Sequence, residues 1–148
     1  MTEPSRDVIL DHYRRPRNRG SLLPPALVAH ASNPLCGDEV VLYVKLSVDA
    51  SRVEEIRFDG RGCSYVLSSA SMLTEFANGE SVADIEAGVA DLVRSMRMPG
   101  LPSGAPERDL DTLQQVKLYP SRIKCALLPW TTLEALLTSA GQSEAHRS

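Results

Sequence analysis

The chain has 148 residues with 43% apolar content, which is enough for a single globular domain with its own core. Its formal charge of −3 comes with basic residues spread along the chain, so the composition argues against a nucleic-acid partner and favours a protein partner. No apolar run approaches the length of roughly 20 residues that is needed to cross a bilayer, and no signal peptide is recognisable. The chain is therefore expected to be cytoplasmic.

The first predicted element is a short amphipathic helix that Ser5 can cap and that ends before a basic, proline-containing turn. We interpret residues 1–20 as a mobile arm. His12 lies on this helix, and we expect it, together with His30 and His146, to be a surface or interface residue rather than a ligand.

Strict alternation of apolar and polar residues predicts a half-buried strand over residues 39–48. Its predicted inner face consists of Val40, Leu42, Val44, Leu46 and Val48. A hairpin-length connection leads to a second strand over residues 53–59, and a third strand is predicted over residues 26–31.

Helical spacing then replaces the alternation, and it predicts helices that begin near Ser64 and Ser81. A short helical turn is predicted over residues 109–115, after a loop rich in proline and glycine. The last helix is predicted to open at Pro120 and to end near Gly141, with a kink or a restart at Pro129 and a disordered tail over residues 141–148. Together these elements predict one α+β domain over residues 1–148, in which helices cover one face of a small antiparallel sheet of about three strands.

The three cysteines, Cys36, Cys63 and Cys125, are odd in number and widely spaced, which argues against a disulfide framework. They are therefore buried filler, metal ligands or reactive thiols. Each lies at a break between predicted elements, where ligands and nucleophiles are usually presented.

The cysteine neighbourhoods favour a metal site. Asp38 follows Cys36 by two residues, with Gly37 between them, so the carboxylate and the thiol can point to the same place, although an aspartate here can also be a turn or capping group. Cys63 and Cys125 each precede or open a helix, and a helix amino terminus favours a thiolate over a thiol. Two or three thiolates with one carboxylate match a closed tetrahedral zinc site, or part of the ligand set of an iron-sulfur cluster.

Four segments carry a family resemblance: ILDHYRRPRNRG, NPLCGD, GRGCSYVLSSASML and RIKCALLPW. Together they resemble the IscU and NifU amino-terminal scaffold family over nearly the whole chain. The chain is most similar to the SufU-type branch for two reasons. Lys124, rather than histidine, precedes the last cysteine, and a segment of about 20 residues, near 100–119, separates the long helix from that cysteine. The segment SYVLSS and Pro129 depart from the branch pattern.

This resemblance implies an IscU/SufE-like fold and a role in iron-sulfur cluster assembly. It implies that Cys36, Asp38, Cys63 and Cys125 are zinc ligands and that Cys36 is the catalytic sulfur acceptor. The implied partner is a SufS-type cysteine desulfurase, so the activity would be that of a zinc-dependent sulfurtransferase.

Other functions remain open at this stage. The same four residues can instead hold a transient [2Fe-2S] cluster, which would make the chain an iron-binding scaffold. A third interpretation is a purely structural zinc, and a fourth is a cysteine hydrolase, for which no base can be named. The sequence leaves open whether Arg122 or Lys124 stabilises a persulfide or only balances the negative charge of the site.

Overall fold

The computed structural model describes residues 3–34, 37–101 and 108–147. The elements within these ranges are, in chain order, α1 (Glu3–Arg14), β1 (Leu27–Asn33), β2 (Asp38–Leu46), β3 (Val53–Arg61), α2 (Ser64–Ala77), α3 (Val82–Arg97), the 3₁₀ helices η1 (Asp109–Leu118) and η2 (Pro120–Arg122), and α4 (Ile123–Arg147).

The sheet has three antiparallel strands in the order β1-β2-β3. At one end of the sheet, Asn33 of β1 faces Asp38, the first residue of β2, and Arg61 at the end of β3 faces Glu39. Because α2 begins three residues after β3, its amino terminus lies at this same end. The register therefore places the start of β2 beside the start of α2.

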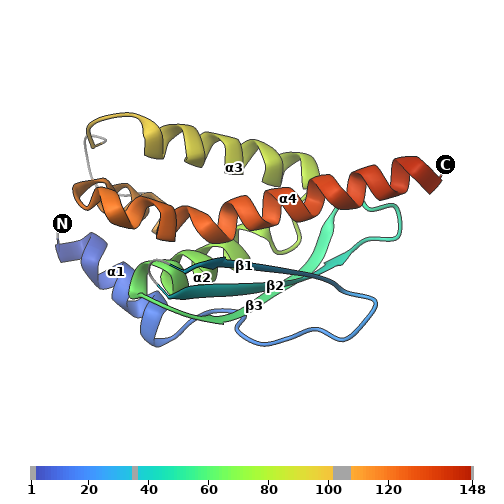
Figure 1. The fold of residues 1–148 in the computed structure, drawn as a ribbon, viewed down its shortest axis with the longest axis horizontal. Helices are drawn as coiled ribbons and strands as arrows, with labels where there is room; N and C mark the ends of the chain where they lie inside the picture. Colours follow the sequence, from blue (N-terminus) through green and yellow to red (C-terminus); the bar gives the residue numbers. More distant parts are fainter. Residues whose placement is uncertain (1–2, 35–36, 102–107, 148) are drawn as a thin grey trace.

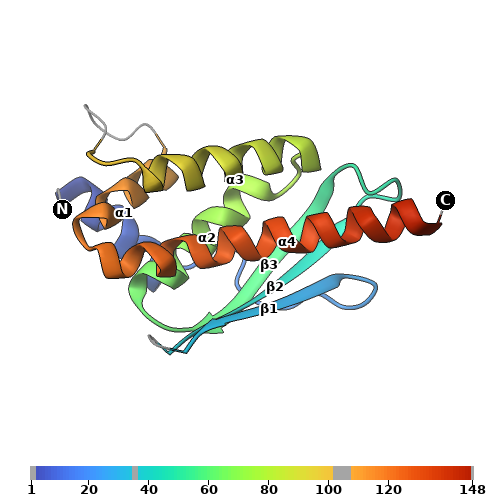
Figure 2. The same ribbon diagram turned by 45° about the horizontal axis from the view of Figure 1, so that its top comes forward.

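One face of the sheet carries the core. Val40, Leu42 and Val44 of β2 are buried, as the alternation predicted, whereas Val48 lies beyond the strand and is exposed. The helices α2 and α4 pack against this face, and α3 packs on α4 farther from the sheet (Figures 1 and 2). This arrangement confirms the predicted α+β fold with helices on one face.

The helix α2 is buried around most of its circumference, and its serines supply the polar contacts that such burial requires. The Ser68 hydroxyl donates to the Ile9 carbonyl of α1 at 2.6 Å, and the Ser69 hydroxyl donates to the Ala126 carbonyl of α4 at 2.5 Å. Trp130 of α4 donates its indole N–H to the same Ser69 oxygen at 2.8 Å. The segment SYVLSS thus fixes α2 between α1 and α4.

The N-terminal segment differs from the prediction of a mobile arm. Helix α1 packs on α2, and Ile9 and His12 are buried. The expectation that His12 lies at the surface was wrong, because the fold supplies both of its ring nitrogens with hydrogen-bond partners. His30, by contrast, is exposed on β1.

The C-terminal elements are longer than predicted. The turn expected over residues 109–115 is the 3₁₀ helix η1, which extends to Leu118. Helix α4 runs on to Arg147, beyond the predicted end near Gly141 and through the predicted tail over residues 141–148, and Pro129 lies inside it without a restart. Among the helices that the structure describes, none is long and apolar enough to cross a membrane.

Candidate metal centre

Three of the four predicted ligands converge at the end of the sheet where β2 and α2 begin. Asp38 is the first residue of β2, Cys63 is the N-cap of α2, and Cys125 lies in the first turn of α4. One carboxylate oxygen of Asp38 and the two Sγ atoms all lie within 4.8 Å of one another. The fourth predicted ligand, Cys36, lies outside the described residues.

The site is shielded from solvent. Asp38 and Cys125 are buried, and Cys63 is partly buried. Sulfur ligands at about 2.3 Å and a carboxylate oxygen at about 2.0–2.2 Å are the usual zinc distances, so donors this close together suit a single ion.

The two carboxylate oxygens of Asp38 differ in their hydrogen bonding. The backbone N–H of Cys63 donates a hydrogen bond to Oδ1 at 3.1 Å, which fixes the carboxylate at the amino terminus of α2. The other oxygen, Oδ2, is buried and has no hydrogen-bond partner among the described residues. A buried carboxylate oxygen without a partner is costly, and a metal ion supplies the missing interaction. The donor set of one carboxylate and two thiols therefore fits a zinc ion.

Gly62 allows the close approach between β3, α2 and Asp38. Its φ of +148° is unfavourable for residues with a side chain, and a Cβ at this position would lie 2.3 Å from Oδ1 of Asp38 and 2.8 Å from Cγ1 of Val66. Steric contacts with Asp38 and Val66 therefore require glycine at this position, immediately before Cys63.

We expect Gly62→Ala to displace Asp38 and to weaken metal binding at least tenfold, roughly the effect of disturbing a group that orients a ligand. The clash and the backbone strain together are expected to lower the free energy of unfolding by about 2–5 kcal/mol. Chemical denaturation and competition with a chelator measure the two effects. The matched control is Gly79→Ala, which also has positive φ (+79°) but has open space around its Cβ. Equal losses in the two variants would contradict this role for Gly62.

Tyr65 lies close to the thiol of Cys63, and Tyr119 and Arg122 lie close to Tyr65. Arg122 was a candidate from the sequence, whereas the two tyrosines were not. The rings of Tyr65 and Tyr119 have centroids 6.4 Å apart. Burial raises the pKa of Tyr65, the neighbouring Tyr119 and Cys63 raise it further, and the positive charge of Arg122 partly offsets this shift in pKa. Tyr65 therefore remains a neutral phenol at physiological pH, and Arg122 is the cation that acts on this side of the site. Lys124, in contrast, is exposed.

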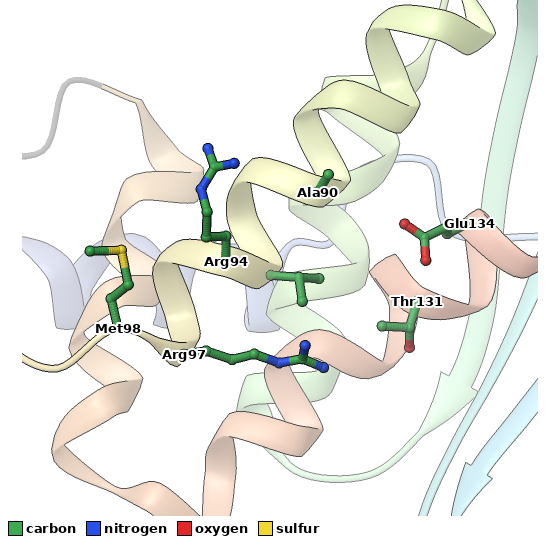
Figure 3. Close-up of a pocket in the computed structure, with 7 residues that line it drawn as sticks. Ala90, Arg94, Arg97, Met98, Thr131 and Glu134 are labelled. Atoms are coloured by element: carbon green, nitrogen blue, oxygen red, sulfur yellow. The ribbon is translucent and has the colours of Figure 1, made fainter.

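A shallow pocket lies elsewhere, between α3 and α4 (Figure 3). Arg94, Arg97 and Met98 border it from the α3 side, and Thr131 and Glu134 border it from α4. None of the converging donors lines this pocket, so it is separate from the candidate metal centre.

Comparison with known proteins gives consistent matches. Residues 5–126 match the family described as the NifU-like N terminal domain. The zinc-dependent sulfurtransferase SufU of Bacillus subtilis (strain 168) is 41% identical over 132 residues, which are 87% of this chain and 86% of that protein. The iron-sulfur cluster assembly scaffold protein IscU of Streptococcus pyogenes serotype M1 is 36% identical over 136 residues, 90% of this chain and 82% of that protein.

A solved structure extends the similarity to three dimensions. FiSufU of the thermophile Fervidobacterium islandicum AW-1 superimposes with a TM-score of 0.68 and 26% identity, covering 93% of this chain and 96% of that one. The matches thus span the sheet, the helices and all the residues of the candidate metal centre.

Proposed function

Because the chain belongs to the NifU-like N-terminal domain family, we propose that it is an iron-sulfur cluster assembly protein that works as a zinc-dependent sulfur acceptor. In this proposal a SufS-type cysteine desulfurase supplies persulfide sulfur, and Cys36 accepts it. The observation that carries the proposal is the convergence of Asp38, Cys63 and Cys125 around a buried carboxylate oxygen that has no partner among the described residues.

Asp38, Cys63 and Cys125 would hold the zinc ion, with Cys36 as the fourth ligand. A zinc ion bound there would keep its sulfur ligands deprotonated at neutral pH. Asp38 orients its free oxygen through the hydrogen bond that Oδ1 accepts from the Cys63 N–H. The partly buried phenol of Tyr65, whose raised pKa keeps it neutral, lies beside Cys63 and limits access of water to that side.

The proposed transfer is a thiol-disulfide type of exchange. The thiolate of Cys36 attacks the terminal sulfur of the cysteine persulfide on the desulfurase, and a new S–S bond forms on Cys36. The S–S bond of the desulfurase breaks at the same time, and its cysteine leaves as a thiolate. The exchange therefore needs no external oxidant or reductant. Reactive thiols that must stay reduced agree with a cytoplasmic location, which we include in the proposal.

A second candidate function is a scaffold for a [2Fe-2S] cluster. The relative from Streptococcus pyogenes is named as an IscU scaffold protein and matches 90% of this chain. The same donors, Asp38, Cys63 and Cys125 with Cys36, would then hold the cluster as cargo. Lys124 counts against this function, because a charged lysine has no lone pair with which to replace a histidine ligand.

Metal analysis of protein purified without added metal, under anaerobic conditions, separates the two functions. A zinc-dependent sulfur acceptor is expected to contain close to one equivalent of zinc, to be colourless and to increase the turnover of an added SufS-type desulfurase. Iron with inorganic sulfide, a coloured protein and little zinc would instead establish the scaffold function. Zinc without any effect on the desulfurase would overturn the sulfur-acceptor proposal and leave a structural role for the ion.

A further inference from the structure

A second group of potential ligands lies away from the cysteines. His12 of α1, Glu75 of α2 and Asp109 of η1 each offer one ligand atom, and these atoms all lie within 4.8 Å of one another. The three residues come from elements that are far apart in the sequence. The fold, rather than a local sequence motif, brings them together.

The imidazole of His12 is held in a fixed orientation. The ring is fully buried, and its Nδ1 lies 2.8 Å from the hydroxyl oxygen of Ser71. That oxygen also accepts a hydrogen bond from the backbone N–H of Arg17 at 2.9 Å, so Ser71 is itself fixed. Histidine ligands of metals usually have their second ring nitrogen held by such a partner. The remaining nitrogen, Nε2, is thereby directed at the two carboxylates.

The distances from Nε2 of His12 to the two carboxylates are close to those between two ligands of one metal ion. Nε2 of His12 is 3.7 Å from Oε1 of Glu75 and 2.7 Å from Oδ2 of Asp109. Two ligands about 2.0–2.2 Å from one tetrahedral ion stand roughly 3.3–3.6 Å apart. Glu75 is about 0.1 Å beyond this spacing, and Asp109 must withdraw by less than about 1 Å. Their side chains are 47% and 53% exposed, so both can adjust and an ion can enter from solvent.

The charges around the group leave the carboxylates available to a cation. Arg17 is 2.6 Å from Oδ2 of Asp11 but 3.9 Å from Oε1 of Glu75, so its main partner is Asp11. Within the described part of the chain, no lysine or arginine forms an ion pair with Asp109. Among the described residues, Arg17 is the one arginine or lysine that forms an ion pair with either carboxylate, at 3.9 Å from Glu75.

We propose that His12, Glu75 and Asp109 form a second metal site, selective for a divalent transition-metal ion that accepts nitrogen and oxygen ligands. Imidazole with carboxylates suits ions such as Zn²⁺, Co²⁺ or Fe²⁺, whereas the site at Cys63 and Cys125 is sulfur-rich. When Nε2 binds the ion, Nδ1 carries the ring proton and donates it in a hydrogen bond to the Ser71 hydroxyl oxygen. A bound ion would join α1 to α2 and η1.

Cobalt is the probe of choice, because sulfur ligands give Co²⁺ intense charge-transfer bands and nitrogen and oxygen ligands do not. Purified protein is titrated with Co²⁺ in equilibrium dialysis, with the spectrum recorded at each step. We expect one equivalent of cobalt beyond the metal held by the thiols, bound without any increase in the sulfur bands. In Glu75→Gln/Asp109→Asn this additional binding is expected to weaken at least tenfold, and the sulfur bands are expected to stay unchanged.

The matched control is Glu86→Gln/Asp91→Asn, which removes the same two charges from exposed positions on α3. It is expected to bind the additional cobalt normally. Because the double variant at the site also changes the partner of a buried histidine, Glu75→Gln alone serves as a milder test and is expected to weaken binding severalfold. No additional cobalt, cobalt bound only with sulfur bands, or equal binding by the site variants and the control would overturn the proposal. None of these outcomes bears on sulfur transfer, which is measured separately.

Discussion

Replacing Cys125 with serine is expected to weaken zinc binding strongly. Zinc contributes on the order of 10–16 kcal/mol to the folding of small zinc domains, so each of four ligands accounts for about 2.5–4 kcal/mol. The loss of one buried thiolate therefore corresponds to a decrease in zinc affinity of about seventyfold to a thousandfold. Without the ion, Oδ2 of Asp38 stays buried with no partner among the described residues, and this adds to the loss of stability.

Zinc release in the presence of a competing chelator measures the affinity, and chemical denaturation measures the free energy of unfolding. The internal control is a comparison of the two proteins in excess chelator. Because wild type and Cys125→Ser then both lack the ion, their stabilities are expected to come within about 1 kcal/mol, the usual effect of a moderate core substitution. A stability difference that the chelator leaves unchanged would mean that Cys125 acts only through packing.

Replacing Cys36 with serine is expected to abolish sulfur transfer while the chain stays folded. A serine hydroxyl is almost entirely protonated at neutral pH and is a poor nucleophile without a base, so the desulfurase rate that depends on this chain should fall at least about a hundredfold. Asp38, Cys63 and Cys125 remain, so the variant is expected to keep a measurable part of its zinc. Turnover of a SufS-type desulfurase, with zinc content measured in parallel, tests this expectation.

Two further variants make the Cys36 experiment specific. Cys36→Ala is expected to behave like Cys36→Ser, because neither side chain can form a persulfide. Ser32→Ala, at an exposed position in β1, is expected to retain full activity and controls for changes at this end of the sheet. Full stimulation by a folded Cys36→Ser protein would refute Cys36 as the acceptor. Reduced stability with retained stimulation would favour the structural-zinc interpretation.

The sequence predicted the sheet and the starts of α2 and α3 because these features are set locally, whereas α1 begins at Glu3, ahead of the predicted cap Ser5, and α4 begins at Ile123 rather than Pro120. The alternation of apolar and polar residues around Val40 and Leu42 indicates a strand with one buried face, which the structure has. Ser81 caps α3, because its hydroxyl oxygen accepts a hydrogen bond from the backbone N–H of Asp84 at 3.1 Å. The positions of Cys63 and Cys125 at helix starts followed from the same local signals. With the resemblance added, Asp38, Cys63 and Cys125 could be chosen before their proximity was known.

Features set by distant contacts could not be predicted in this way. His12 is buried because Ser71 and Asp109, 59 and 97 residues away in the chain, bind its two ring nitrogens. The periodicity of α1 predicts a helix but does not tell whether another element covers it. Similarly, Pro129 lies within α4, which continues without a restart although the intrinsic preference of proline predicts an interruption. Tertiary packing overrides the local signal in both cases.

The candidate metal centre takes its donors from three separate parts of the chain, and this bears on the order of events during synthesis. Asp38 and Cys63 leave the ribosome well before Cys125, which opens the last helix. A growing chain that lacks α4 has an incomplete donor set and lacks the helix that covers β1 and β2. The proposed zinc ion would therefore be acquired late, when the last helix docks, and a truncated or stalled product would be unable to hold it.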